Sequence, residues 1–330
     1  MIKLLVHLSR LFVGAMFVFS GFVKLVDPIG SEYKFEEYFS ESVLNIEFLA
    51  PYALQFSILL ILAEIMLGVT LLLGYKAKLT VWSLFILSLV FLFLTWYSAY
   101  YNKVTDCGCF GDAIKLTPWE TFYKNIILIA LVILLLIRVK DIKEFLPKKV
   151  TAALTLICLL SFSYITYHVL NHLPLIDFRA YAVGKSIPEG MEFPDDPEAV
   201  PPIENFILED TQNDLTQEIL EEEKMMLIIV SKIKKIKEKD EEKVNEEGFA
   251  EVKKIADEAI LKGYKVYGVT GDFPDELILL QNKYDLPFEF LFADGTTVKT
   301  MIRANPGIMI LNKGTVTGKW NWKDTDDIKL

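Results

Sequence analysis

The chain has 330 residues, of which 52% are hydrophobic, and a mean hydropathy of +0.35 that excludes an ordinary soluble protein. Its charge is uneven, because residues 175–330 contain 20 Lys and Arg against 32 Asp and Glu, whereas residues 1–174 are almost neutral. An acidic domain repels phosphate, so we expect no nucleic-acid partner. The composition therefore predicts two domains of different class, a membrane domain and an acidic globular domain.

Five apolar runs in the first half are each close to the length of about 20 residues that crosses a bilayer. The first run is too long for a cleaved signal peptide and lacks a cleavage site followed by a soluble domain. The sequence therefore predicts an α-helical membrane bundle of about five transmembrane helices, in contact with membrane lipid. The predicted spans cover residues 3–26, 52–74, 79–98, 122–138 and 150–170.

The distribution of Lys and Arg between the spans predicts their orientation. The short link after the second span carries Lys76 and Lys78, and the link after the fourth span is also basic, whereas the link after the first span is acidic. We therefore expect the basic links and the N-terminus in the cytoplasm. Five spans then leave the C-terminal domain outside the cytoplasm, in a multi-pass protein of the bacterial inner (cytoplasmic) membrane.

Two ionisable side chains lie inside the predicted spans. Arg10 is about two turns into the first span, and Glu64 is near the middle of the second. Each is costly in hydrocarbon unless it is paired or hydrated, so we expect both to face the interior of the bundle, where each is a candidate partner for the other. For Arg10 the alternative is that the side chain reaches the membrane surface. The small residues Gly14 and Gly21 predict close packing of the first span against a neighbour.

The motif with the clearest chemistry is D-C-G-C-F-G-D at residues 106–112, between the third and fourth spans. A disulfide between Cys107 and Cys109 closes a very small ring, for which Gly108 supplies the backbone freedom. Such a disulfide is strained and therefore easily reduced, which favours thiol–disulfide exchange. The flanking aspartates disfavour a thiolate, so a structural role for the turn stays open.

Metal and cofactor sites are not predicted from these residues. Two thiols are too few ligands for a structural metal, and no histidine lies nearby in the sequence. The third cysteine, Cys158, lies inside the fifth span and is interpreted as a small apolar residue.

The second half of the chain alternates strand and helix patterns after a proline-rich segment, residues 175–204, that is predicted to be a linker. The order of strands and helices predicts parallel first strands and an antiparallel final hairpin, which is the order of the thioredoxin fold. We therefore expect an α/β thioredoxin-like domain. Strands are predicted at 225–231, 264–269, 288–292, 306–311 and 315–320, helices at 245–261 and 274–284, a hairpin at 204–215, a helical turn near 296–303 and a last helix near 324–330.

The membrane half resembles the DoxX-like family and, within it, the methylamine-utilisation MauE-like group, over about residues 1–140. The pieces that carry the resemblance are R-L-F-V-G-A-M-F-V-F-S-G-F-V-K-L-V-D-P (10–28), A-E-I-M-L-G-V-T-L-L-L-G (63–74) and the cysteine motif. The resemblance implies an integral inner-membrane protein that assists the maturation or oxidation of extracytoplasmic partner proteins. Four spans are usual in that family, so the expected domains are a four-helix domain (1–149), a fifth transmembrane helix (150–174), the linker (175–204) and the extracytoplasmic domain (205–330).

The C-terminal domain resembles the thioredoxin-like, or redoxin, family in strand 225–231 and in N-P-G-I-M-I-L-N-K-G-T-V-T-G-K-W (305–320). The resemblance implies a cis-proline at Pro306 beside the active site. The family's Cys-x-x-Cys motif is replaced by Lys-Ile-Lys-Lys after the strand, and the domain contains no cysteine. It therefore cannot exchange dithiols by itself, and the charged run 232–243 is predicted to be a solvated loop or a partner-binding surface.

Three functions follow from these observations. In the first, Cys107 and Cys109 form a redox pair that exchanges with an extracytoplasmic protein partner, which the cysteine-free domain docks. In the second, the protein is a non-enzymatic scaffold whose thioredoxin-like domain binds a partner complex. In the third, Arg10 and Glu64 belong to a carrier for a small molecule or ion, which the lack of inverted repeats disfavours.

Overall fold

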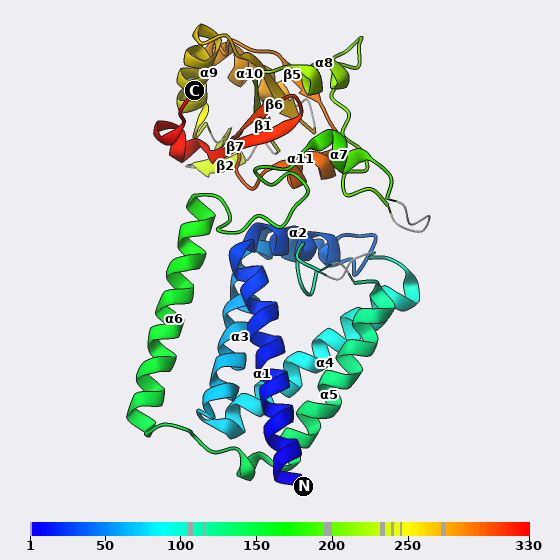
Figure 1. The fold of residues 1–330 in the computed structure, drawn as a ribbon, viewed down its shortest axis with the longest axis vertical. Helices are drawn as coiled ribbons and strands as arrows, with labels where there is room; N and C mark the ends of the chain where they lie inside the picture. The colour runs from blue at the N-terminus through cyan, green and yellow to red at the C-terminus, as the bar shows by residue number, and fades with distance from the viewer. Residues whose placement is uncertain are drawn as a thin grey trace. The chain divides into compact units, whose positions relative to one another are not determined.

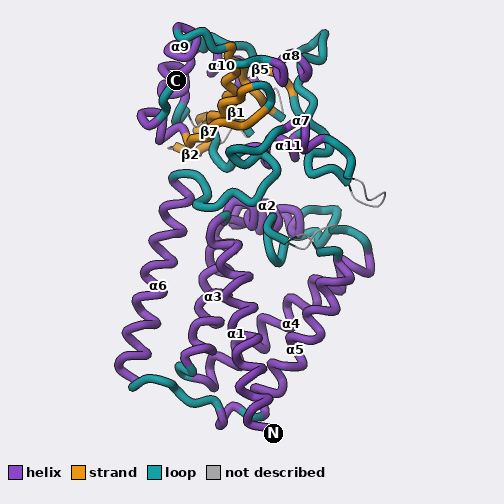
Figure 2. The backbone as a smooth tube through the Cα atoms, in the orientation of Figure 1, coloured by secondary structure: helices purple, strands orange, loops and turns teal. Residues whose placement is uncertain are grey.

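The computed structural model divides the chain into two compact units, Met1–Leu170 and Asn171–Leu330 (Figure 1). The first unit is helical and the second mixes helices and strands (Figure 2). The residues that the structure describes are 2–104, 108–114, 116–194, 200–231, 235–238, 241–244, 246–271 and 275–330.

The five predicted membrane spans are confirmed in the first unit, where five helices are long and apolar enough to cross a membrane. The second of these spans includes a short 3-10 helix, η1, at its start. The elements are α1 (Ile2–Val26), α2 (Pro28–Phe39), η1 (Glu47–Tyr52), α3 (Ala53–Leu73), α4 (Ala77–Tyr101), α5 (Pro118–Ile137), η2 (Val139–Asp141) and α6 (Lys148–Asn171).

Helices α1 and α3 run side by side and pack through glycines. Gly14 and Gly21 of α1 lie against α3, and Gly68 of α3 lies against α1. A Cβ atom on Gly21 would lie 2.7 Å from the backbone nitrogen of Ile65. The missing side chains thus let the two backbones approach, because packing rather than hydrophobic burial drives helix association in lipid.

Replacing Gly21 with alanine is expected to destabilise the membrane unit by about 1–3 kcal/mol, since the added methyl group forces α1 away from Ile65. Thermal unfolding of the detergent-solubilised protein, followed by helical circular dichroism, measures the change. The matched control is Ala15→Leu, at an exposed position of the same helix. Equal stability of Gly21→Ala and the wild type would show that α1 and α3 do not depend on this close approach.

Helix α6 is peripheral to the other four spans. Only 11% of its most apolar window is buried within the protein, against 28–39% in the other spans. Phe162 and Ile165 of this helix pack beside Leu25 and Ile61. The bundle core is therefore formed by α1, α3, α4 and α5.

Helix α2 was not predicted, because the link between the first two spans reads as an acidic loop. Asp27 caps this helix by accepting a hydrogen bond from the Gly30 nitrogen at 3.0 Å, and Pro28 occupies its first turn, where a proline is tolerated. The hydroxyl of Ser57 on α3 donates to the Pro28 carbonyl at 2.8 Å. The helix lies across the end of the bundle, where Phe39 is buried (Figure 1).

The second unit contains a five-stranded sheet in the order β5-β4-β1-β6-β7. Strand β1 pairs in parallel with β4 and antiparallel with β6, β4 pairs in parallel with β5, and β6 and β7 form an antiparallel hairpin. The predicted mixture of parallel and antiparallel strands is therefore confirmed. The elements are α7 (Ile187–Met191), α8 (Thr216–Glu221), β1 (Met225–Val230), β2 (Lys235–Glu238), β3 (Glu241–Val244), α9 (Phe249–Leu261), β4 (Lys265–Thr270), α10 (Asp275–Tyr284), β5 (Phe290–Phe292), α11 (Gly295–Met301), β6 (Gly307–Asn312), β7 (Thr315–Asn321) and the 3-10 helix η3 (Trp322–Asp327).

The sheet separates two hydrophobic cores because alternate residues of β1 point to opposite faces. Leu227 belongs to one core together with residues of α11, and Ile228 belongs to the other together with residues of α9. All six residues of β1 are buried. The continuous apolar run M-M-L-I-I-V is thus the pattern of a strand covered on both faces.

The described residues of the segment 175–204, which are 175–194 and 200–204, differ from the predicted linker, since they include residues that pack onto the sheet. Tyr181, Ile187 and Ile203 are buried in the core on one face. The nitrogen of Gly184 donates to the Val316 carbonyl at 2.7 Å, and that of Ile187 donates to the Gly314 carbonyl at 2.9 Å. Prolines interrupt regular structure, but the apolar residues between them can still be buried.

Two further elements differ from the sequence-based expectations. The charged run 232–243, predicted to be a solvated loop or a partner-binding surface, includes β2 and most of β3, which pair in antiparallel. High charge predicts contact with water, but it does not prevent backbone pairing. The helix predicted near 324–330 is instead the 3-10 helix η3, which begins at Trp322.

Candidate functional site

The turn that carries the cysteine motif lies between α4 and α5. Cys107 lies outside the described residues, so the structure places only Cys109 of the proposed pair. Gly108 has a φ of +66°, in the left-handed region where a side chain is strained, and its Cα lies against the stem of Lys34. Gly108 therefore uses the backbone freedom for which a glycine is expected between the two cysteines.

A cluster of buried polar groups holds the turn to the bundle. The Lys24–Glu64 cluster consists of Ser20, Lys24, Glu64 and the backbone carbonyl of Cys109. The Lys24 ammonium lies 3.0 Å from Glu64 Oε2 and donates to the Cys109 carbonyl at 2.7 Å and to the Ser20 hydroxyl oxygen at 2.8 Å. The Ser20 hydroxyl lies 2.6 Å from Glu64 Oε1 and 2.8 Å from the Cys109 carbonyl. The cysteine turn is therefore anchored by groups from α1 and α3.

Burial makes these contacts energetically important. The exposed fractions of the Lys24 and Glu64 side chains are 7% and 2%. An isolated charge at such a place is strongly disfavoured, so each ion depends on the other. The three protons of the Lys24 ammonium match three oxygen acceptors, which leaves the cation well satisfied.

Arg10 has different partners from Glu64, so the two predicted residues are not brought together. Its guanidinium donates to the carbonyls of Leu71 at 2.8 Å and Leu72 at 2.7 Å, and to that of Lys143 at 3.0 Å. These leucines end α3, where carbonyls lack helical partners and the helix dipole favours a cation. Arg10 is thus a buried structural cap at the end of α3.

The antiparallel arrangement of α1 and α3 explains this separation. Arg10, near the start of α1, lies level with the end of α3, whereas Ser20 and Lys24 lie level with Glu64. Lys24 is not among the residues that the sequence pattern singles out. The spacing of residues in the first span was a signal for a polar face that includes Lys24. Lys24 lies one helical turn after Ser20, and it lies 14 residues, or about four turns, after Arg10 on the same face of the helix.

Two cavities adjoin the cluster and share Phe91 and Cys109 in their walls. The larger has about 540 Å³ of empty space, including the part that opens to the surroundings, and is bounded by α1, α2, α3, α4 and the cysteine turn. The smaller, of about 290 Å³, reaches Glu64 and Lys124. The larger cavity, called the α2 pocket below, is walled mainly by apolar side chains.

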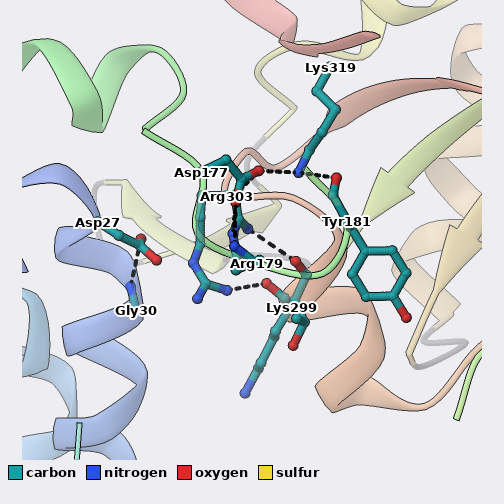
Figure 3. A network of polar contacts seen from close by, with 9 residues as sticks. Asp27, Gly30, Asp177, Arg179, Tyr181, Lys299, Arg303 and Lys319 are labelled. Carbon is teal, nitrogen blue, oxygen red and sulfur yellow. Dashed lines mark hydrogen bonds and ion pairs between the residues drawn. The ribbon is translucent and has the colours of Figure 1, made fainter. Parts of the chain in front are cut away.

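The α/β unit contains a second buried polar network, shown in Figure 3. Arg179 binds Asp177 through two hydrogen bonds of 2.7 and 2.9 Å, and Lys319 lies 2.7 Å from the second oxygen of the same carboxylate. Lys319 also donates to the Tyr181 carbonyl at 3.2 Å. One carboxylate therefore joins the segment 175–204 to β7.

The pKa values in this network follow from burial and charge. Burial, followed by the nearby charge of Arg179, lowers the pKa of Lys319 to about 8, although Asp177 opposes the shift. For Asp177, burial acts upwards, but the charges of Arg179 and Lys319 leave its pKa below the usual value. Burial raises the pKa of the Tyr181 hydroxyl well above its usual value.

Pro306 lies at the start of β6, and the Asn305–Pro306 peptide bond is cis. The side chain of Asn305 accepts a hydrogen bond from the Ser231 nitrogen at 3.0 Å, directly after β1. Four residues, 232–235, replace Cys-x-x-Cys; residues 232–234 lie outside the described part of the chain, and Lys235 begins β2. Within the described ranges, no group of three or more His, Cys, Asp or Glu side chains is arranged to hold a metal ion.

A comparison with protein-family models finds a similarity in the membrane unit. Residues 2–138 match the family model of the methylamine utilisation protein MauE, a stretch that contains α1 to α5. No curated protein and no solved structure matches the chain. The protein is therefore a multi-pass membrane protein in which residues 2–138 are similar to MauE, followed by a mixed α/β domain.

Proposed function

We propose that this protein is an accessory membrane protein that transfers disulfide bonds to extracytoplasmic partner proteins through Cys107 and Cys109. The observation that carries the proposal is the hydrogen bond of 2.7 Å from the buried Lys24 ammonium to the Cys109 carbonyl. Ionisable groups inside a membrane are costly and usually mark functional sites. Here the buried Lys24–Glu64 ion pair holds the cysteine turn in place. This arrangement favours a chemical role for the turn over the role of a loop that only connects two helices.

The proposed reaction is thiol–disulfide exchange. A thiolate of the partner attacks the disulfide between Cys107 and Cys109 and forms a mixed disulfide. The second partner thiol then displaces the protein's cysteine, so the partner gains a disulfide and Cys107 and Cys109 become two thiols. Two electrons and two protons pass from the partner to the pair.

The topology supports a shared compartment for the cysteine turn and the α/β domain. The turn follows α4, and the α/β domain follows α6, which is two crossings later and therefore on the same side. The links with Lys76 and Lys78 and with residues 138–149 lie on the other side, which the excess of basic residues assigns to the cytoplasm. The proposed orientation is thus extracytoplasmic for both the turn and the domain.

The α/β domain is assigned the role of docking the partner. Its strand order supports a thioredoxin-like fold, which remains a prediction together with the wider DoxX-like resemblance. Residues 171–330 contain no cysteine, so the domain cannot carry the exchange itself. A thioredoxin-like surface without thiols is suited to binding a substrate protein beside another dithiol.

Trapping of mixed disulfides in cells tests the proposal. Removing the resolving cysteine is expected to make Cys107→Ser or Cys109→Ser accumulate a covalent complex, and the partner is expected to shift towards its reduced form in both variants. Alkylation of partner thiols before electrophoresis measures that shift, and Cys158→Ser, which changes a cysteine of α6, is the matched control. Unchanged partner thiols in both variants would refute the exchange, and retention of the partner complex by Cys107→Ala/Cys109→Ala would establish the scaffold function instead.

A further inference from the structure

We propose that the α2 pocket binds the ring of a membrane quinone. The inference rests on the proposed function for its role, because thiols that have oxidised a partner need an electron acceptor before the next cycle. The binding site itself depends only on the walls and the charges of the α2 pocket.

The walls of the α2 pocket suit a flat, largely apolar ring. Phe35 of α2 and Phe91 of α4 contribute aromatic side chains, and Leu60 and Leu94 contribute aliphatic ones. Aromatic and apolar side chains with a few polar groups are typical of sites for small organic ligands. The aromatic wall continues beyond Phe35, whose ring centroid lies 5.6 Å from that of Phe39.

The charges around the pocket favour an uncharged ligand over an anionic one. Lys24 and Lys34 both line it, but Lys24 is paired with Glu64 at 3.0 Å and Lys34 with Glu37 at 2.9 Å. The two cations are thus neutralised, so a phosphate headgroup finds no excess of positive charge there. Lys34 has protons beyond the one that Glu37 accepts, and it can donate to a neutral carbonyl oxygen of the kind that a quinone carries.

The pocket extends to the cysteine turn, since Gly108 and Cys109 form part of its wall. A ring bound there therefore lies against Cys109, one member of the proposed redox pair. In the reaction, the thiols of Cys107 and Cys109 lose two electrons and two protons and form a disulfide bond, and the quinone gains them and becomes a hydroquinone. The bilayer supplies the quinone and removes the hydroquinone, and both are lipid-soluble.

Binding of decylubiquinone to the purified full chain in detergent, measured by isothermal titration calorimetry, tests the site. Filling the pocket with Leu60→Trp is expected to weaken binding by at least about tenfold, because the indole occupies the space of the ring. The matched control Leu59→Trp, at a neighbouring position whose side chain is 67% exposed, is expected to bind like the wild type. A second pair of variants tests another wall of the pocket, so that a folding defect in one variant does not decide the result. Leu94→Trp fills the pocket, and its control is Phe93→Trp, at a position whose side chain is 53% exposed.

Equal binding by both members of each pair, or no saturable binding by the wild type, would overturn the inference. Displacement of decylubiquinone by an anionic phospholipid at equal concentration would also overturn it, because the pocket would then recognise a headgroup charge. The Cys107→Ser/Cys109→Ser protein is expected to bind the quinone but not to reduce it, as followed by the quinone's ultraviolet absorbance. Partner trapping without quinone binding refutes this inference alone, whereas saturable quinone binding without any partner thiol shift refutes the proposed function and leaves the site in place.

Discussion

Replacing Glu64 with leucine is expected to destabilise the membrane unit by about 3–5 kcal/mol, because it leaves the buried Lys24 ammonium without its counter-ion. The double replacement Lys24→Met/Glu64→Leu is expected to recover most of this loss, since two apolar side chains of similar size need no desolvated charge. The Ser20 hydroxyl lies 2.8 Å from the Cys109 carbonyl, so we expect it to donate there in that variant and to keep one anchor of the turn.

Unfolding of the full chain in detergent measures this effect through the fluorescence of Trp82, Trp96 and Trp119, in a background where Trp320 and Trp322 are phenylalanine. The control is Lys34→Met, which breaks a half-exposed ion pair and is expected to cost no more than about 1 kcal/mol. A double variant as unstable as Glu64→Leu would contradict the ion-pair explanation. It would show that the cluster stabilises the bundle mainly through its hydrogen bonds to the cysteine turn.

The stability of the α/β domain is expected to rise with pH between about 8 and 10.5, with a contribution of about 3 kcal/mol from Lys319. The folded-state pKa of Lys319 is about 8, against 10.5 in an unfolded chain. In this interval the unfolded state binds more protons than the folded state, so raising the pH favours folding. Below pH 8 both states are protonated, and the cost of burying the ammonium is fully present.

Denaturant unfolding of the full chain at several pH values, read from Trp320 and Trp322 after Trp82, Trp96 and Trp119 are changed to phenylalanine, measures this dependence. The comparison is between the wild type and Lys319→Met, because tyrosines such as Tyr181 ionise above pH 10 only in the unfolded state and act in the opposite direction. The variant is expected to lose the rise between pH 8 and 9.5. A rise of equal size in both proteins would assign it to other groups.

Much of the fold was predictable because it follows from local patterns. Apolar runs of about 20 residues have few alternatives to membrane helices, and M-M-L-I-I-V at 225–230 has few alternatives to a buried strand. The segment 175–204 was misjudged because burial of Tyr181 and Ile187 depends on the sheet edge that receives them, which lies more than 100 residues away. Helix α2 is not predicted because its many charged residues are typical of a loop. The evidence for a helix is its capping residue, Asp27, and its packing on the bundle.

The candidate site, like the fold, has features that are visible in the sequence and features that depend on the tertiary structure. The amino-acid sequence shows which reactive and ionisable residues are present: a Cys-Gly-Cys turn after a span, Arg10 and Glu64 within predicted spans, and an α/β domain without cysteine. The partners of these residues follow from the tertiary structure, because the antiparallel alignment of α1 and α3 sets Lys24 beside Glu64 and Arg10 beside the end of α3. Partnership between charges inside a membrane depends on which helices are neighbours and at what depth each residue lies, and a single sequence contains neither quantity.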